Sequence, residues 1–186
     1  ITKVAYGSPN TTVTVYGGTD YDLADATITS PYYSCMKAPQ GFPLGSDDWT
    51  VEVTDSTSRI NSSFTAGTWY NTGSISIDIP IGCWDISYQC MIFSARVAAG
   101  KITIKSTLST GTSTESDSDF TAAYSLTADK ATELNHGLTV YRRKFLTLST
   151  KDTYYMNIMG PEAYTTGHIR LYNSYTPLII RATCAY

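Results

Sequence analysis

The most regular pattern in the chain is Ser74-Ile75-Ser76-Ile77-Asp78-Ile79, in which isoleucine alternates strictly with a polar residue. Successive side chains of a β-strand point to opposite faces, so this pattern predicts a strand with one buried and one exposed face. Pro80 and Gly82 then turn the chain into a longer segment, Trp84–Val97. That segment carries large apolar residues at both alternating positions near its end, which predicts a strand at the centre of a sandwich, buried on both sides.

Further strands are predicted on both sides of this segment, separated by turn signals every 8–15 residues. They cover residues 12–16, 49–54, 101–105, 120–126, 138–148, 154–159, 168–172 and 178–185. Residues 106–119 are rich in Ser, Thr, Gly and acid and are predicted to be a mobile loop. Residues 127–136 are predicted to hold one helical turn. The fold class is therefore all-β, an antiparallel two-sheet sandwich or jelly roll.

One structural domain is expected from a length of 186 residues. Residues 46–186 are assigned to the jelly-roll head, and residues 1–45 to an irregular N-terminal segment packed on it, with a short strand near 26–29. The chain begins at Ile1, which predicts a fragment or a processed product. No apolar run is long enough to span a bilayer, so no membrane insertion is expected.

Composition points to binding and away from nucleic acid. Only 16% of residues are charged, and the chain holds 15 tyrosines, which combine contact area with a polar tip. The net charge of −3 argues against a nucleic-acid partner, which requires a basic patch. The single basic cluster, Arg142-Arg143-Lys144, would divide between the two faces of a strand.

Catalytic and metal-binding motifs are absent from the sequence. It contains no GxSxG, HExxH, P-loop or GxGxxG pattern, and its two histidines, His136 and His168, fall in a loop or at a strand end. The acidic stretch Glu115–Asp119 lacks the glycine and distal glutamate of an EF-hand, so a solvated acidic loop is expected. The chain is therefore predicted not to be an enzyme and to hold no metal or cofactor.

The four cysteines, at positions 35, 83, 90 and 184, form no CxxC pair. Two disulfides are arithmetically allowed, but a chain of this length does not need them. Cys90 lies among apolar residues in the middle of the predicted central strand, which is typical of a buried thiol. Free thiols are the favoured interpretation.

Saccharide binding is the functional hypothesis that the residue types support. A saccharide site needs an aromatic ring to contact the C–H face of the sugar, together with acid, amide or arginine groups for the hydroxyls. The candidate residues are Asp48, Trp49, Trp69, Tyr70, Arg142, Tyr164 and His168. In the alternative interpretation Trp49 and Trp69 are core or interface residues, and Trp84 is assigned to the core.

Two segments resemble the jelly rolls of the TNF and C1q families. In Trp69–Ala95 the likeness rests on Pro80, Gly82, Trp84, Tyr88 and Phe93. In Tyr141–Gly160 it rests on Leu146, Leu148, Asp152, Tyr154 and Tyr155. The chain departs from eukaryotic C1q domains at its last strand, which reads Ile179-Ile180-Arg181-Ala182. Over residues 69–186 it looks most similar to the trimeric head domains of siphophage receptor-binding proteins.

This resemblance implies a homotrimer that binds a host cell-surface saccharide at the virion tail tip or baseplate, beside other tail or baseplate proteins. The second apolar face of Trp84–Val97 and the aromatic segment 154–159 would supply the contacts between protomers. Assembly in a reducing cytosol would agree with free thiols. Two alternatives remain: an extracellular C1q-like jelly-roll lectin with disulfides, and a structural or decoration protein of the virion that binds no ligand.

Overall fold

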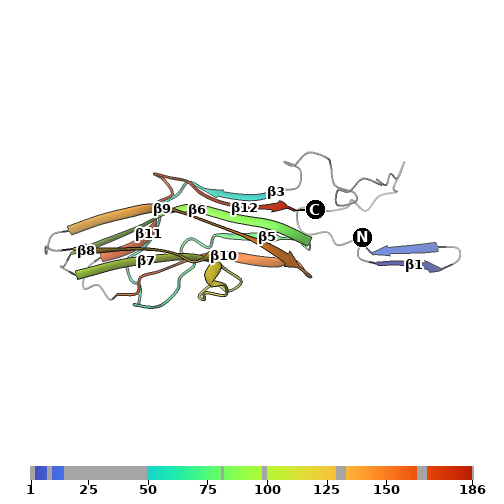
Figure 1. Cartoon of the computed structure of the whole chain (residues 1–186), viewed down its shortest axis with the longest axis horizontal. Coiled ribbons are helices and arrows are strands. Elements are labelled where there is room, and N and C mark those ends of the chain that lie inside the picture. Colours follow the sequence, from blue (N-terminus) through green and yellow to red (C-terminus); the bar gives the residue numbers. More distant parts are fainter. Residues whose placement is uncertain are drawn as a thin grey trace.

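The computed structural model describes residues 3–7, 10–14, 50–80, 82–97, 100–128, 133–162 and 167–185. These residues form three antiparallel sheets, two of which stack as a sandwich with strands running along its long axis (Figure 1). The described strands are β1 Lys3–Gly7, β2 Asn10–Thr14, β3 Thr50–Asp55, β4 Arg59–Asn61, β5 Ser76–Ile79, β6 Gly82–Val97, β7 Gly100–Ser109, β8 Ala122–Ala128, β9 Glu133–Leu148, β10 Asp152–Met159, β11 Gly167–Leu171 and β12 Leu178–Cys184. A 3-10 turn, η2, covers Ser118–Phe120.

The larger sheet of the sandwich is built around β6. The strand β9 pairs with β6 over its whole length, from Gly82 to Val97. On the opposite edge of β6, β12 pairs with residues 84–89 and β11 with residues 92–96. β3 continues the sheet beyond β12, and β4 continues it beyond β11. The smaller sheet has the order β5-β10-β7-β8, and β1 and β2 form a separate hairpin sheet.

The core lies between the two sheets and confirms the predicted faces. Trp84, Ile86, Tyr88, Cys90 and Ile92 point inward from β6 and are each at most 1% exposed. The small sheet contributes the facing apolar residues Ile77, Ile79, Ile104, Leu108, Met156 and Ile158. Burying an aliphatic side chain of this size stabilises the fold by about 1.5–3 kcal/mol, so this alternation drives the stacking of the sheets.

Two polar side chains of β6, those of Tyr88 and Cys90, are buried in the core. The Tyr88 hydroxyl lies 2.8 Å from the carbonyl oxygen of Phe120 and 3.2 Å from that of Ser106, and it can donate its one hydrogen to either. Its polar tip is therefore hydrogen-bonded inside the core. Burial raises the pKa of the Cys90 thiol to about 12. Cys83 and Cys90 are free thiols, as expected, and Cys35 lies outside the described residues.

Three predictions of irregular structure were wrong, the first of them for residues 3–7, which lie in the N-terminal segment assigned as irregular and form β1. β7 extends through residues 106–109, which had been assigned to a mobile loop, and all four residues are buried. The residues at the end of the segment predicted as a helical turn belong to β9, which begins at Glu133. In these last two places the local composition is polar, but pairing with a strand distant in the sequence determines the backbone. β4, which was not predicted, forms by pairing with β11 in the same way.

The acidic stretch before η2 also differs from the flexible loop that was expected. The Nζ atom of Lys144 lies 2.6 Å from Asp117 Oδ2 and 2.8 Å from Asp119 Oδ2. The Asp117 side chain also accepts a hydrogen bond from the backbone N–H of Asp119. This stretch is therefore anchored on β9 by a lysine, and no group of three or more metal-ligating side chains occurs among the described residues.

The second apolar face of β6, which was expected to need a neighbouring copy, is covered within the chain. Phe93 is 7% exposed because Arg170 and Tyr172 pack against its ring. On β10, Met159 is 8% exposed and Asn157 is fully buried. Exposed apolar residues of the outer face lie on β9, where Tyr141 and Phe145 are 58% and 64% exposed, and on β4, where Ile60 is 51% exposed.

Candidate functional site

A shallow pocket of about 450 Å³ opens at the side of the sandwich, where β4 and the turn after Tyr70 approach the loop that follows β7. Its walls carry one aromatic ring, two amides, several hydroxyls and one aliphatic side chain. The lining residues are Ile60, Asn61, Tyr70, Asn71, Thr72, Ser74, Thr112 and Ser113. None of these lining residues, which belong to the described part of the chain, is charged.

Backbone pairing with the small sheet fixes the aromatic wall of this pocket. Tyr70 and Ile158 exchange two backbone hydrogen bonds of 2.9 Å, which anchor Tyr70 beside β10. The Tyr70 hydroxyl oxygen accepts a hydrogen bond of 2.8 Å from the backbone N–H of Thr65. The side chain and then the backbone N–H of Thr65 lower the pKa of the Tyr70 hydroxyl by hydrogen bonding, and the backbone contact holds the ring in one orientation.

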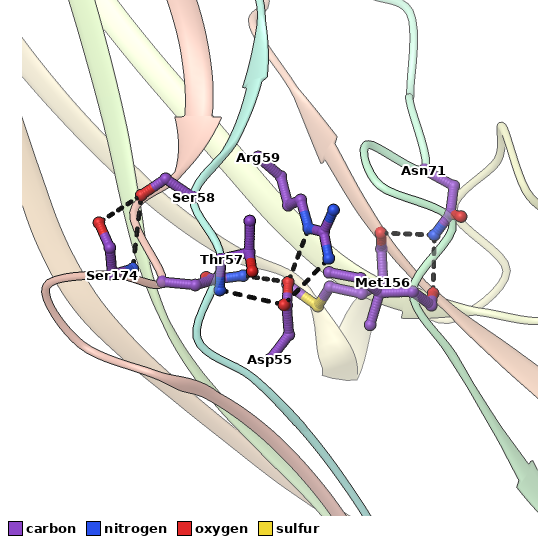
Figure 2. A network of polar contacts seen from close by, with 9 residues as sticks. Asp55, Thr57, Ser58, Arg59, Asn71, Met156 and Ser174 are labelled. Carbon is purple, nitrogen blue, oxygen red and sulfur yellow. Dashed lines mark hydrogen bonds and ion pairs between the residues drawn. The ribbon is translucent and has the colours of Figure 1, made fainter.

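The amide of Asn71 is held in place equally firmly. Its Nδ2 donates to the carbonyl oxygens of Ile75 and Met156, at 2.8 and 2.9 Å (Figure 2). Both amide hydrogens are therefore used, and within the described part of the chain no donor reaches Oδ1. The side chain can offer that oxygen as an acceptor to a hydroxyl group in the pocket.

The turn that follows Asn71 depends on glycine and on an arginine. Gly73 has a φ of +92°, and a Cβ added there would lie 2.6 Å from Arg59 Cδ. Arg59 is held in turn by Asp55, with Nε–Oδ2 and Nη2–Oδ1 distances of 2.9 and 3.1 Å (Figure 2). The Asp55–Arg59 pair thus supports the pocket wall from behind.

Asp55 is the centre of this supporting network. Its carboxylate also accepts hydrogen bonds from the Thr57 backbone N–H and from Asn173 Nδ2, at 3.1 and 2.8 Å. Burial raises the pKa of Asp55, but the hydrogen bonds from Arg59, Thr57 and Asn173 outweigh it and leave this pKa below its ordinary value of 3.8. The side chain is therefore ionised at neutral pH.

Thr72 carries an unused polar group at the pocket. It is one of the lining residues, and its Oγ1 is fully enclosed without a hydrogen-bond partner among the described residues. An enclosed hydroxyl that lacks a partner is energetically costly, at about 1–3 kcal/mol. The pocket therefore offers a rigid ring, an amide oxygen and an unpaired hydroxyl, a set suited to holding a ligand rich in hydroxyl groups.

A second feature, here called the aromatic–arginine row, lies on the outer face of the large sheet. It consists of Phe93, His168, Arg170, Tyr172 and Tyr175. The Phe93 ring stacks on His168 at 6.1 Å and meets Tyr172 edge-on at 5.4 Å, and Tyr172 lies 5.7 Å from Tyr175. Gly137 on β9 leaves the space for Phe93, because a Cβ there would lie 2.9 Å from Cδ2 of that ring.

The structure separates the residues that the sequence proposed for saccharide binding. Tyr70 lines the pocket and His168 belongs to the aromatic–arginine row. Trp69 is 8% exposed and belongs to the core, the alternative that the sequence left open, so its ring faces the interior. Arg142 is exposed on β9, opposite Tyr88 in the register. Asp48, Trp49 and Tyr164 lie outside the described residues.

Several pocket residues were not among the candidates, notably Asn61, Thr72 and the Thr112-Ser113 pair. They come from three separate segments, and the sequence carries no signal that these segments meet. Asn71 and Thr72 had a local signal, since an aromatic residue followed by an amide and a glycine is typical of a turn that presents polar groups.

Comparison with known proteins gave no match, either to a family model or to a curated protein. No helix in the described part of the chain is long and apolar enough to cross a membrane.

Proposed function

We propose that this chain is a non-catalytic saccharide-binding module and that its binding site is the pocket at Tyr70. The observation that carries this proposal is the pocket lining, which combines a fixed aromatic ring with the Asn71 amide oxygen and the unpaired Thr72 hydroxyl. An aromatic ring covers the C–H face of a sugar, and amides and hydroxyls pair with its hydroxyl groups. The lack of charged groups in the lining favours binding over acid–base chemistry.

We further propose that the sandwich is a jelly roll. When β1, β2, β4 and β11 are set aside, eight strands remain, four in each sheet. Along the chain these eight strands alternate between the sheets at every step except β7 to β8. Long crossings between two four-stranded sheets are the mark of the double Greek key, which supports this topology.

At the level of biology, we propose that the module is the head of a bacteriophage receptor-binding protein, acting as a homotrimer on a host cell-surface saccharide. The likeness of residues 69–186 to such heads supports this, as do the exposed Tyr141 and Phe145 on β9, which offer a surface for a second copy. Several sites on one particle would then act together, so that each needs only about millimolar affinity.

The pocket is tested by titrating the protein with neutral monosaccharides and short cell-wall oligosaccharides while recording backbone amide NMR spectra. We expect saturable shifts at Asn61, Tyr70 and Thr72. Tyr70→Ala should weaken binding at least tenfold, and Tyr70→Phe, which keeps the ring, should retain most of it. Tyr141→Ala, which removes an exposed tyrosine far from the pocket in the sheet order, is the matched control. Saturable binding that Tyr70→Ala leaves unchanged would refute the site.

A further inference from the structure

The guanidinium of Arg170 is placed unusually for an arginine on a sheet surface. Its Cζ lies 3.9 Å from the centroid of the Phe93 ring and 3.7 Å from that of Tyr172. Contacts of this kind stabilise a cation and fix the side chain over the rings. The rings therefore hold a positive charge in one position on the outer face of the large sheet.

This positive charge has no carboxylate partner within the part of the chain that the structure describes. Arg59, Arg143 and Arg181 pair with Asp55, Asp85 and Glu52, respectively. Arg170, by contrast, makes only the two ring contacts, and its Nε is enclosed without a hydrogen-bond partner among the described residues. Enclosing part of a charged group without a hydrogen bond is costly, so an additional partner is favoured at this position.

The register of the sheet places this charge next to the pocket. Arg170 on β11 pairs directly with Ile60 on β4, and Ile60 is 51% exposed and lines the pocket. Neighbouring strands lie about 4.8 Å apart, so an acidic substituent of a ligand bound in the pocket can extend over Ile60 onto β11. The described lining of the pocket is uncharged, whereas the neighbouring strand β11 carries Arg170, which has no carboxylate partner among the described residues.

We propose that Arg170 forms an anion subsite that receives an acidic substituent, a carboxylate or a phosphate ester, of the saccharide bound at Tyr70. This inference rests on the proposed function and names its ligand class, an acidic glycan. The planar guanidinium fork matches both oxyanions and can donate two hydrogen bonds to either one. Phe93 and Tyr172 orient the fork, and His168 extends the aromatic surface beside it.

The subsite is tested through the Nε–Hε NMR signals of the arginine side chains, with the intact protein titrated with glucuronate, glucose 6-phosphate, inorganic phosphate or glucose. We expect a saturable shift of the Arg170 signal with glucuronate or glucose 6-phosphate, and none with glucose. Comparing the two acidic sugars shows which oxyanion is preferred, and inorganic phosphate shows whether the sugar is needed. Arg181, which is exposed and already paired with Glu52, is the internal control.

Two variants complete the test. Arg170→Gln should weaken glucuronate binding at least fivefold and leave glucose binding unchanged, and Arg170→Lys should restore only part of the affinity, because it keeps the charge and loses the fork. An absent response up to about 50 mM ligand, well above a millimolar Kd, or equal shifts at Arg170 and Arg181, would overturn the subsite. Tyr70→Ala separates the two proposals, since it should weaken the binding of neutral sugars at least tenfold and leave the response of Arg170 to anions intact.

Discussion

The outer faces of the two sheets are built in opposite ways. On the small sheet the outward residues of β7 are polar, yet Thr103, Thr107 and Ser109 are buried, because the chain folds its own segments over them. On the large sheet the outward residues include Tyr141 and Phe145, which remain exposed. Polar residues are thus covered on the small sheet and two aromatic residues are exposed on the large sheet, so the large sheet is the face on which the proposed contacts between copies are tested.

Hydrogen bonds explain how the small sheet tolerates a polar covered face. Asn157 donates from Nδ2 to the carbonyl oxygens of Gly111 and Thr114, at 2.7 and 2.9 Å. Thr103 donates to Glu162 through its backbone N–H and its hydroxyl, at 2.9 and 2.8 Å. The cover is therefore fixed by specific contacts, and removing one of them should cost more than removing an exposed aromatic from the other sheet.

The largest effect is expected from Asn157→Ala. It removes two buried hydrogen bonds and leaves two loop carbonyls without their donor, so the free energy of unfolding should fall by about 2–3 kcal/mol. Urea unfolding followed by fluorescence measures this change. Asn61→Ala, which removes the same amide from an exposed turn contact, is the matched control and should cost at most about 0.5 kcal/mol. Equal losses in the two variants would contradict the view that this loop is a fixed cover.

The second-largest effect is expected from acid, which should weaken the hydrogen bonds that Asp55 accepts behind the pocket. The pKa values of Asp55, Asp78 and Asp117 are all lowered in the folded state, so their contribution to stability is present above the ordinary value of 3.8 and is lost as the pH falls through the lower folded values. Asp55→Asn should lower the free energy of unfolding by about 1–2 kcal/mol at pH 7 and flatten this acid dependence.

Unfolding curves between about pH 2 and pH 7 measure this acid dependence, because the window spans the ordinary carboxyl pKa. Glu52→Gln, which alters an exposed carboxylate paired with Arg181, is the control. A variant at Asp55 whose stability falls with acid as steeply as that of the native chain would show that Asp55 contributes nothing to the slope.

A smaller effect on stability, of at most about 0.5 kcal/mol, is expected from Phe145→Ser, because the ring is 64% exposed. Its effect on assembly should be large if β9 meets a second copy, converting a trimer to monomers in light scattering. Thr139→Ser, on the same outward face of β9, is the control. A native chain that scatters as a monomer at every concentration would remove the trimer from the proposal.

The smallest effect is expected from Arg181→Gln on the same face. Arg181 pairs with Glu52 at 2.5 Å, but its side chain is 53% exposed, and exposed ion pairs contribute about 0–1 kcal/mol. A change in melting temperature within experimental error would agree with this value. A loss as large as that of Asn157→Ala would mean that the outer face of the large sheet is as firmly fixed as that of the small one.

The strands that the sequence predicted correctly share one property, which is that alternation is visible within the segment itself. Ile75, Ile77 and Ile79 all turn one face inward, as their spacing requires. The polar end of β7 carries no such pattern, since Ser106, Thr107 and Ser109 are buried by contacts distant in the sequence. Local periodicity reports which face meets the core, and it does not report what the rest of the chain places on the other face.

The candidate site shows the same limit. Tyr70 was predicted because it lies in a turn beside an amide, and its neighbour Trp69 points the other way, into the core, as alternation along an extended segment dictates. Asn61, Thr112 and Arg170 were not predicted, because each reaches the site through strand pairing or loop packing. A pocket assembled from separate segments leaves no contiguous motif to read.

The antiparallel pair formed by β4 and β11 has a consequence for how the proposed specificity can change. It is attached to the far half of β6, outside the eight strands that alternate between the sheets, and it carries Ile60, Asn61, His168 and Arg170. Under the proposed function, substitutions at Ile60, His168 and Arg170 would alter ligand preference without touching the residues buried between the sheets. If the proposed function holds, evolution can vary these outward side chains while Ile169 and Leu171, the buried residues of β11, keep the scaffold unchanged.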